Sequence, residues 1–312
     1  RPNAEVRRPR LGGGGITRYT ACVIGCGNIG THAETDPVRP KPATHAGAWL
    51  THPQVDLLAV ADTDFPQAKA AGRALGVPYS FDDAAQMVGQ MGPAIVSVAT
   101  PVSTHAAVVA VVCRASRQVK AIICEKPMAS SSAEGQGMVD LCRARGVRLF
   151  VNHGRRFDPV LRAEAARMDK IVGVPRSAVG WYSGGLREGG THMVDLMRMF
   201  LGEAEVVGSS GGDALLRFAP GVRGALLGHD LAEHAIFELV VTGREGRLIL
   251  ARAGLDIRWE RATEGYPLAS GYRQLAPNGS WRDPEPRSFL GAMADHVVAV
   301  LDGLEKPLST GE

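Results

Sequence analysis

The sequence predicts an α/β fold, in which an N-terminal Rossmann domain with a doubly wound parallel sheet precedes a C-terminal α+β domain on an open, mainly antiparallel sheet. Three observations support this prediction. Short apolar runs alternate with amphipathic stretches over about 130 residues from Tyr19. A glycine-rich motif directly follows the first apolar run. After Asn152 the pattern changes to shorter segments of the kind found in antiparallel sheets.

The first domain is predicted from apolar runs that have the length of strands buried on both faces. These runs are Ala21–Gly25, Val55–Ala61, Ala94–Ala99, Ala121–Cys124 and Val147–Asn152. Helices are predicted between them at Pro66–Leu75, Asp82–Gly89, Thr104–Arg117 and Ser131–Arg145. Glu134 follows Ser131 at the spacing of a capping box, which supports the start of the last helix. Residues 1–16 include consecutive glycines and predict a flexible arm, so the domain should span 17–152.

The second domain, 153–312, is expected to bind the substrate and to mediate oligomerisation. Its helices are predicted at Pro159–Met168, Thr191–Phe200 and Phe289–Leu301. Its strands are predicted at Ser177–Tyr182, Glu205–Ser209, Ala214–Phe218, Ala235–Val241, Arg247–Ala251 and Asp256–Glu260. The segments Trp181–Gly190 and Trp259–Trp281 are expected to be loops that build the substrate pocket.

Composition argues against several functional classes. The net charge is +3 and the basic residues are scattered, so a nucleic-acid partner is not expected. Residues 1–15 lack the apolar segment of a signal peptide, and no apolar run is long enough to span a bilayer. We therefore expect a cytoplasmic protein with no membrane partner. The five cysteines form no CxxC pair, which favours buried thiols over a metal site or a disulfide framework.

Gly25-Cys26-Gly27-Asn28-Ile29-Gly30 matches the GxGxxG motif of dinucleotide-binding turns. In such turns the first glycine allows a tight bend, the second lets the backbone approach the pyrophosphate, and the third permits close packing of helix on strand. The N-terminus of the following helix then stabilises the phosphate charge. A purely structural turn is the alternative, but the position after the first strand favours a nucleotide site formed by these six residues.

Asp62 directly follows the second predicted strand. A carboxylate at this point accepts hydrogen bonds from the adenosine ribose and repels a 2′-phosphate, so NAD is predicted rather than NADP. The alternative is that Asp62 or Asp64 merely caps the next helix. The separation of Gly30 from Asp62 exceeds the usual spacing of about 20 residues. An insertion near Glu34–Ala43, rich in proline and charge, accounts for the excess.

Two segments carry candidate catalytic residues. Glu125-Lys126-Pro127 follows the strand Ala121–Cys124, at the strand end where open α/β sheets bind ligands. In the helix from Thr191, an apolar stripe is formed by Met193, Leu196, Met197 and Phe200. His192 and Asp195 lie on another face, with Glu188 just before them. The alternatives are a solvated surface lysine and a helix start whose histidine is incidental.

On these residues, the chain resembles the glucose-fructose oxidoreductase / inositol dehydrogenase / MocA (Gfo/Idh/MocA) family from about Tyr19 onward. The resemblance is carried by Gly25–Gly30, Ala61-Asp62, Thr100-Pro101 with His105, Glu125–Pro127, Arg156-Phe157, Gly190–Asp195 and the glycine turn Thr242–Arg247. It implies that Thr100, Pro101, His105 and Glu125 line the cofactor cleft and that no metal takes part.

The resemblance also implies roles in catalysis. Lys126 and His192 would flank the carbinol carbon that faces the nicotinamide, with His192 as general acid–base and Lys126 stabilising the reacting oxygen. Asp195 would orient substrate hydroxyls or the histidine, and Arg156 would help to bind the substrate. Glu188 takes the position of an aspartate that many members carry four residues before the histidine.

The expected function is therefore NAD-dependent hydride transfer involving a secondary alcohol or ketone of a sugar, cyclitol or sugar derivative. Three alternatives stay open: an NAD-dependent glycosidase with transient sugar oxidation, a non-enzymatic dinucleotide-binding regulator of the same fold, and a reductase of an imine or bilin. The presence of both Lys126 and His192 argues against the regulator. We expect a homodimer or homotetramer joined through strands within Glu205–Glu260.

Overall fold

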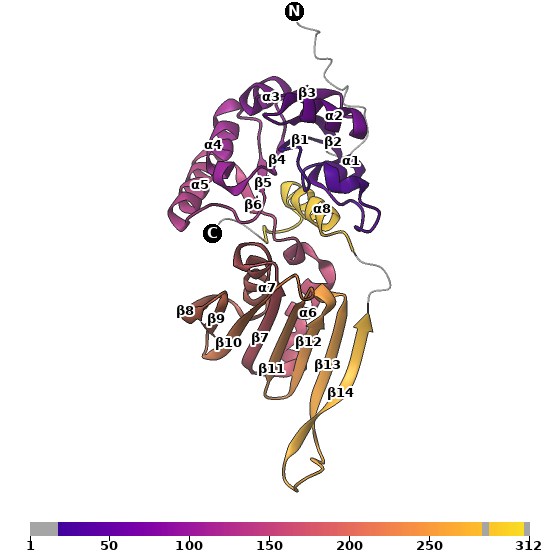
Figure 1. The fold of residues 1–312 in the computed structure, drawn as a ribbon, viewed down its shortest axis with the longest axis vertical. Coiled ribbons are helices and arrows are strands. Elements are labelled where there is room, and N and C mark those ends of the chain that lie inside the picture. The colour runs from indigo at the N-terminus through magenta and orange to yellow at the C-terminus, as the bar shows by residue number, and fades with distance from the viewer. Residues whose placement is uncertain (1–17, 283–286, 309–312) are drawn as a thin grey trace, which may run out of the picture. The chain divides into compact units, whose positions relative to one another are not determined.

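The structure is a computed structural model of the 312-residue chain and describes residues 18–282 and 287–308. The predicted arm at 1–16 lies outside the described residues. The chain forms two compact units (Figure 1). Among the described residues, the first comprises 18–123, Gly137–Leu149 and Ala294–Pro307. The second comprises Cys124–Gln136, 150–282, 287–293 and Leu308.

The N-terminal sheet has six strands in the order β3-β2-β1-β4-β5-β6, which is a doubly wound order. The strands are β1 (Tyr19–Ile24), β2 (Val55–Ala61), β3 (Tyr79–Phe81), β4 (Ile95–Val98), β5 (Ala121–Cys124) and β6 (Arg148–Val151). β1 pairs in parallel with both β2 and β4, and β2 pairs in parallel with β3. The predicted Rossmann fold is confirmed. Only β3 was not predicted, because its three residues are half-buried and form no apolar run.

The helices that connect these strands are α1 (His45–Thr51), α2 (Phe65–Leu75), α3 (Ala84–Met91), α4 (His105–Ala115) and α5 (Ser132–Arg145), with short 3₁₀ turns at His32–Thr35 and Val102–Thr104. Ser131 Oγ caps α5 by accepting from Glu134 N–H, as predicted, while the Glu134 carboxylate accepts from the N–H of Ser130, one residue before the N-cap. All five cysteines are buried, as predicted. Over the described residues, no helix combines the length and apolar character that crossing a membrane requires.

The last helix, α8 (Phe289–Leu301), ends in the first unit, whereas the sequence placed everything after 153 in the second domain. Side chains explain the difference. Asp302 accepts hydrogen bonds from Tyr19 Oη at 2.7 Å and from Gln54 Nε2 at 3.1 Å. Val297 and Val298 are fully buried. These contacts join residues that lie far apart in the sequence, so no local sequence pattern predicts them.

The second unit contains an eight-stranded sheet in the order β14-β13-β12-β11-β7-β10-β9-β8. Its strands are β7 (Pro175–Ser183), β8 (Ala204–Ser210), β9 (Asp213–Phe218), β10 (Val222–His229), β11 (Phe237–Gly243), β12 (Gly246–Ala251), β13 (Asp256–Glu264) and β14 (Arg273–Arg282). All neighbours pair antiparallel except β7 and β10. The predicted open, mainly antiparallel sheet is confirmed.

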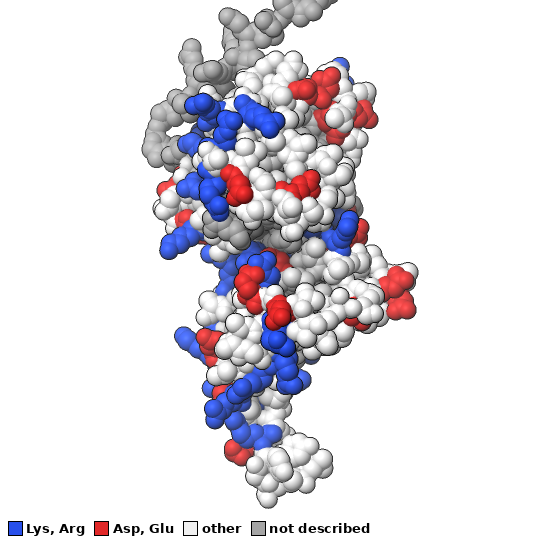
Figure 2. Space-filling model, turned by 90° about the vertical axis from the view of Figure 1, so that its left-hand side faces the viewer, with Lys and Arg blue, Asp and Glu red and all other residues white. Residues whose placement is uncertain are grey.

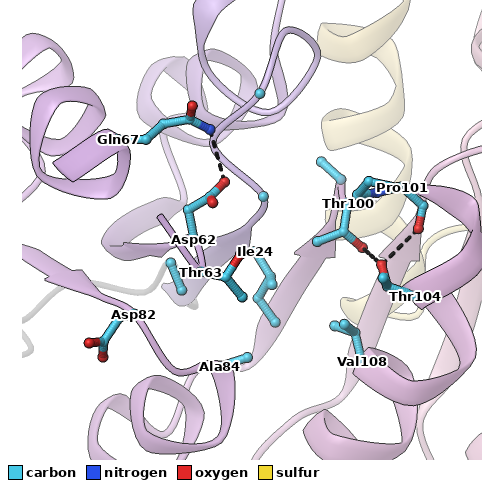
Figure 3. Close-up of a pocket in the computed structure, with 14 residues that line it drawn as sticks. Ile24, Asp62, Thr63, Gln67, Asp82, Ala84, Thr100, Pro101, Thr104 and Val108 are labelled. Atoms are coloured by element: carbon cyan, nitrogen blue, oxygen red, sulfur yellow. Dashed lines mark hydrogen bonds between the residues drawn. The ribbon is translucent and has the colours of Figure 1, made fainter. Parts of the chain in front are cut away.

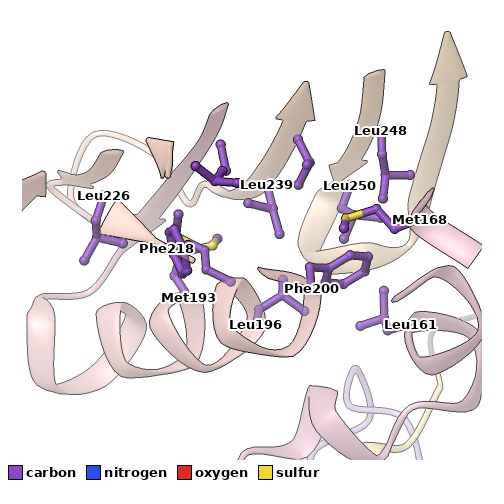
Figure 4. Close-up of a cluster of buried hydrophobic side chains, with 14 of the residues drawn as sticks. Leu161, Met168, Met193, Leu196, Phe200, Phe218, Leu226, Leu239, Leu248 and Leu250 are labelled. Carbon is purple, nitrogen blue, oxygen red and sulfur yellow. The ribbon is translucent and has the colours of Figure 1, made fainter. Parts of the chain in front are cut away.

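One face of this sheet is covered by α6 (Pro159–Val172) and α7 (Thr191–Leu201). The predicted stripe of α7 is buried, and Met193, Leu196 and Phe200 pack with Leu161 of α6 against the strands (Figure 4). Burial of large aliphatic and aromatic side chains is the main stabilising contribution here. It fixes α7 on the sheet and thereby the position of His192 beside Met193.

Two strands were not predicted, and one predicted loop is wrong. Glycines interrupt the apolar pattern of β10, and β14 is mostly exposed, so neither shows a clear period. The expected pocket loop Trp259–Trp281 is instead largely a hairpin, in which Trp259 pairs with Gly279. Trp259 Nε1 donates to Glu164 of α6 at 2.8 Å. This tryptophan therefore packs between sheet and helix.

Candidate active site

The glycine turn is followed by an interrupted helix. The backbone N–H groups of His45 and Ala46 donate to the carbonyls of Ile29 and Gly30 at 3.0 and 3.1 Å. Ala33 N–H donates to the carbonyl of Asn28, so His45 takes the position that would follow Ala33, and residues 34–44 form an excursion of 11 residues. Without it, the separation of 32 residues between Gly30 and Asp62 becomes the usual spacing of about 20. This agrees with the insertion predicted at Glu34–Ala43.

The three glycines of the turn have three distinct steric roles. Gly25 has a φ of +98°, and a Cβ there would lie 2.5 Å from the carbonyl oxygen of Ala99. A Cβ on Gly30 would lie 1.9 Å from the carbonyl oxygen of Gly25. A Cβ on Gly27 would meet no protein atom within 4 Å, because this residue faces a cavity. A pyrophosphate site requires a tight turn, close packing of helix on strand, and open access to the backbone. Gly25, Gly30 and Gly27 meet these requirements in that order, so the turn fits a dinucleotide.

The cavity has a volume of about 540 Å³ and lies at the carboxyl ends of β1, β2 and β4 (Figure 3). Its lining includes Gly25, Gly27, Asp62, Gln67, Asp82, Thr100, Pro101 and Thr104. The Asp62 carboxylate accepts from Cys26 N–H at 2.8 Å and from Gln67 Nε2 at 3.1 Å. The N-cap of α2 is Asp64, whose side chain accepts from Gln67 N–H. Asp64 is therefore the capping residue, and Asp62 remains at the cavity.

The other predicted cofactor residues divide into lining and supporting groups. Thr100 and Pro101 line the cavity, and Thr104 Oγ1 hydrogen-bonds to both. His105 is 1% exposed, and its ring nitrogen hydrogen-bonds to the carbonyl of Thr100 at 2.8 Å. His105 therefore supports the loop that contains Thr100 and Pro101 and does not itself line the cavity. Within the turn, Cys26 contributes its N–H to Asp62, while the carbonyls of Asn28 and Ile29 accept from Ala33 and His45.

Lys126 and His192 come together within the second unit, although 66 residues separate them in the chain. Burial lowers the pKa of His192 to about 3, and the positive charges of Arg155 and Lys126 add to this effect. The imidazole is therefore neutral at pH 7 and able to accept a proton. Lys126 Nζ donates to the carbonyl of Glu188 at 3.4 Å, in the π-helical turn Leu186–Gly190 that leads into α7. The Glu188 side chain itself is exposed.

Glu125 is buried next to Lys126, where it anchors the segment. One carboxylate oxygen accepts from Asn152 Nδ2 at 2.6 Å, and the other accepts from Lys126 N–H at 3.2 Å. The structure thus places Glu125 with Asn152 in the second unit, a partner that sequence analysis did not identify. Asn152 directly follows β6, so it occupies a strand end equivalent to that of Lys126.

Asp195 forms an ion pair with Arg156. Arg156 Nε donates to both carboxylate oxygens at 2.9 and 3.1 Å, and Nη2 lies 2.8 Å from Oδ1. By contrast, Nδ1 of His192 is buried and has no hydrogen-bond partner among the described residues. Of the two roles predicted for Asp195, orienting the histidine is not seen in this arrangement. The pair instead joins α7 to the segment that follows β6.

His153 and Arg155 were not predicted as site residues from the sequence. The ring of His153 lies 5.6 Å from that of His192 in an edge-to-face arrangement. Burial lowers the pKa of His153, and the charges of Asp195, Arg156, Glu125 and Lys126 all act on it, so it lies amid the predicted catalytic residues. The signal that could have found it is its place after the apolar run Val147–Asn152, since ligands bind at such strand ends.

Comparison with known proteins gives a consistent result. A family model described as "Oxidoreductase family, NAD-binding Rossmann fold" (GFO_IDH_MocA) matches residues 20–153. A D-apiose dehydrogenase of Paraburkholderia graminis is 28% identical over 206 residues, which cover 60% of this chain and 51% of that protein. The match thus spans about half the length of this relative. The scyllo-inositol 2-dehydrogenase (NAD(+)) of Bacillus subtilis is 27% identical over 210 residues, covering 62% and 57%.

Solved structures share the fold over most of the chain. A levoglucosan dehydrogenase in complex with NADH and levoglucosan superposes with a TM-score of 0.74 at 18% identity, covering 94% of this chain and 92% of that chain. A 3-ketoreductase from Actinomadura kijaniata has the same TM-score at 20% identity, with 93% and 92% covered. At these identities the likeness establishes the fold alone.

Proposed function

The chain belongs to the Gfo/Idh/MocA family of oxidoreductases with an NAD-binding Rossmann fold, and from this premise we propose that it transfers hydride between a nicotinamide and a secondary alcohol or ketone of a sugar, cyclitol or sugar derivative. The observation that carries the proposal is that Lys126 Nζ donates to the carbonyl of Glu188 at 3.4 Å, in the turn that leads directly into the helix of His192. The relatives named as D-apiose and scyllo-inositol dehydrogenases support this class of substrate.

In the first unit, the backbone of Gly25–Gly30 would hold the pyrophosphate and Asp62 the adenosine ribose. When bound, the nicotinamide supplies the hydride acceptor or donor. The carboxylate of Asp62 favours NAD over NADP, because a 2′-phosphate beside it would be repelled. Its hydrogen bonds to Cys26 and Gln67 fix the carboxylate in place.

In the second unit, His192 would take the hydroxyl proton as the alcohol is oxidised and return it in the reverse direction. The Lys126 ammonium would stabilise the negative charge that develops on the reacting oxygen. Its backbone is held by Glu125, which Asn152 anchors. Arg156 and Asp195, already paired with each other, would present a fixed polar surface to substrate hydroxyls.

The proposal is tested by a screen of sugars, cyclitols and sugar acids for NADH formation, followed by two substitutions. Lys126→Met and His192→Asn keep side-chain volume but remove the charge and the base. Each should lower kcat about 10²- to 10⁴-fold and leave the Kd for NAD unchanged. Turnover without net NADH would favour a glycosidase. Tight NAD binding without any turnover would favour a regulator.

We further propose that the open face of the second sheet pairs two copies of the chain. Across five strands, cross-strand neighbours form an apolar row of Leu215, Ala225, Val179, Val240 and Ile249. A neighbouring row contains the ion pairs Arg217–Glu205 and Arg247–Glu260. Figure 2 shows basic side chains gathered over this unit with acidic ones beside them. An apolar strip bordered by both charges suits an isologous, self-complementary interface.

A further inference from the structure

Arg155, Arg156 and Arg287 differ in their partners. Arg156 is neutralised by Asp195. Arg287 donates twice to Asp158 Oδ2, at 3.0 and 2.7 Å. The other oxygen of Asp158 accepts the first N–H groups of α6, so this carboxylate is fully engaged. Arg155 forms no ion pair with a carboxylate of the described residues.

Aromatic rings surround Arg155 instead. Its guanidinium carbon lies 3.7 Å from the ring centre of Phe237 and 5.4 Å from that of Phe289. Among the described residues its one hydrogen bond runs from Nε to the carbonyl of Ala253, at 3.4 Å. Arg155 is half-buried, so part of its side chain remains in contact with solvent. Burial lowers the pKa of Arg155 to about 10, which leaves it cationic at pH 7.

This geometry is that of a preorganised anion receptor. A guanidinium stacked on a ring loses little further freedom when it binds, and its planar fork matches the two oxygens of a carboxylate or phosphate. The charge of Arg155 acts on His192, so the two groups belong to one electrostatic site. Asp158 also acts on the charge of Arg155 and is itself paired with Arg287, so four cations (Lys126, Arg155, Arg156 and Arg287) stand against three carboxylates (Glu125, Asp158 and Asp195). One positive charge is therefore left without a counterpart.

We propose that Arg155 binds an oxyanionic group of the substrate, so that the chain acts on acidic sugars or cyclitols in preference to neutral ones. A carboxylate of a sugar acid and the phosphate of a sugar phosphate present the same chemistry to the fork. The inference rests on the proposed function, because it assigns a substrate class to the same site. It adds a specificity residue that neither the sequence pattern nor the family motif identified.

The kinetic test compares matched probes with the NAD-loaded protein. D-glucuronate and D-glucose 6-phosphate represent the two anion sources, and D-glucose is the neutral counterpart. We expect kcat/KM to be at least about 10-fold higher for one of the anionic probes. Arg155→Met should lower that value about 100-fold and remove the preference for the anionic probe over D-glucose. Arg155→Lys keeps the charge but loses the planar fork, so its kcat/KM for the anionic probe should lie between those of the wild type and of Arg155→Met.

Arg167 provides a matched control. Its guanidinium lies 4.7 Å from the ring centre of Trp259, as in a stacked arginine, but it is paired with Glu164. Arg167→Met removes the same charge and a similar stacking contact, and it should leave the ratio between anionic and neutral probes unchanged. A neutral probe that is preferred, with no effect of Arg155→Met on any probe, would overturn the proposal.

A binding titration separates this inference from the proposed function. Calorimetry with D-glucuronate and with D-glucose 6-phosphate requires no turnover. Binding by the wild type and by Arg167→Met, but not by Arg155→Met or only weakly by Arg155→Lys, supports the anion site even if no probe is oxidised. In that case the proposed function fails on its own. Equal binding by all four proteins, or by none, refutes the role of Arg155.

Discussion

The imidazole of His192, whose Nδ1 is buried, predicts how the stability of the protein depends on pH. Its pKa in the folded state is about 3, whereas a histidine in an unfolded chain has a pKa of about 6.5. Above pH 6.5 the group is neutral in both states and contributes nothing to the pH dependence. Below pH 6.5 the unfolded chain takes up a proton here that the folded chain excludes, so the free energy of unfolding falls as the pH is lowered.

The size of this effect follows from the two pKa values. Each pH unit between 6.5 and about 3 removes roughly 1.4 kcal/mol, so at pH 5.0 the loss is about 2 kcal/mol. His192→Asn cannot titrate and lacks this loss. Between pH 7.5 and pH 5.0, the wild type should therefore lose about 2 kcal/mol more than the variant. Lys126→Met removes one of the cations that lower the pKa of His192. Its loss of unfolding free energy between pH 7.5 and pH 5.0 should therefore lie between those of the wild type and of His192→Asn.

Urea unfolding at both pH values measures these differences. The comparison at pH 7.5 isolates the packing change caused by His192→Asn, and the change of that difference at pH 5.0 isolates the titration. Equal losses in wild type and variant would show that the imidazole ionises as it does in water. The assignment of His192 to a buried, cation-rich site would then be wrong.

Three further predictions test the remaining parts of the structure. Gly27→Ala should fold with an unchanged Tm but bind NAD at least about 10-fold more weakly. The Cβ of Gly30→Ala would lie 1.9 Å from a carbonyl oxygen, so this variant should lose more than about 3 kcal/mol of unfolding free energy, measured with urea. Asp62→Ser should reduce the preference for NADH over NADPH in fluorescence titrations, and an unmodified protein that prefers NADPH would contradict the role of Asp62. Val240→Glu should convert a dimer into a monomer by light scattering, while Leu268→Glu, on an exposed turn, should not.

The Rossmann strands were predictable because strands buried on both faces must be apolar along their whole length. The same logic fails for β14, most of whose residues are exposed, and for β10, where glycines break the period. The helix after the glycine turn was hidden for a different reason. The carbonyl of Gly30 accepts from the N–H of Ala46, which lies beyond an inserted segment, and no local sequence pattern predicts a helix that is split in this way.

The candidate site was predictable where chemistry follows a strand end or a helical face, as for Lys126 and His192. The contacts between site residues were not predictable, because they join side chains that meet only in the folded chain. Arg156 and Asp195 were both identified as substrate residues, yet their ion pair spans 39 residues. Arg155 could not be told from its neighbour Arg156 in the sequence. The placement of Phe237 and Phe289 beside Arg155 and of Asp195 beside Arg156 distinguishes the two.

The cations around His192 have opposite consequences before and during the reaction. In the free site, Arg155 and Lys126 disfavour the imidazolium and keep the histidine neutral. As the alcohol loses its proton, the negative charge on its oxygen offsets those cations, and the imidazolium becomes easier to form. A substrate that carries a carboxylate would neutralise Arg155 as soon as it binds and raise the pKa of His192 before hydride transfer. An anionic substrate would therefore both bind more tightly and meet a stronger base, whereas a neutral sugar would leave the base weak until the transition state.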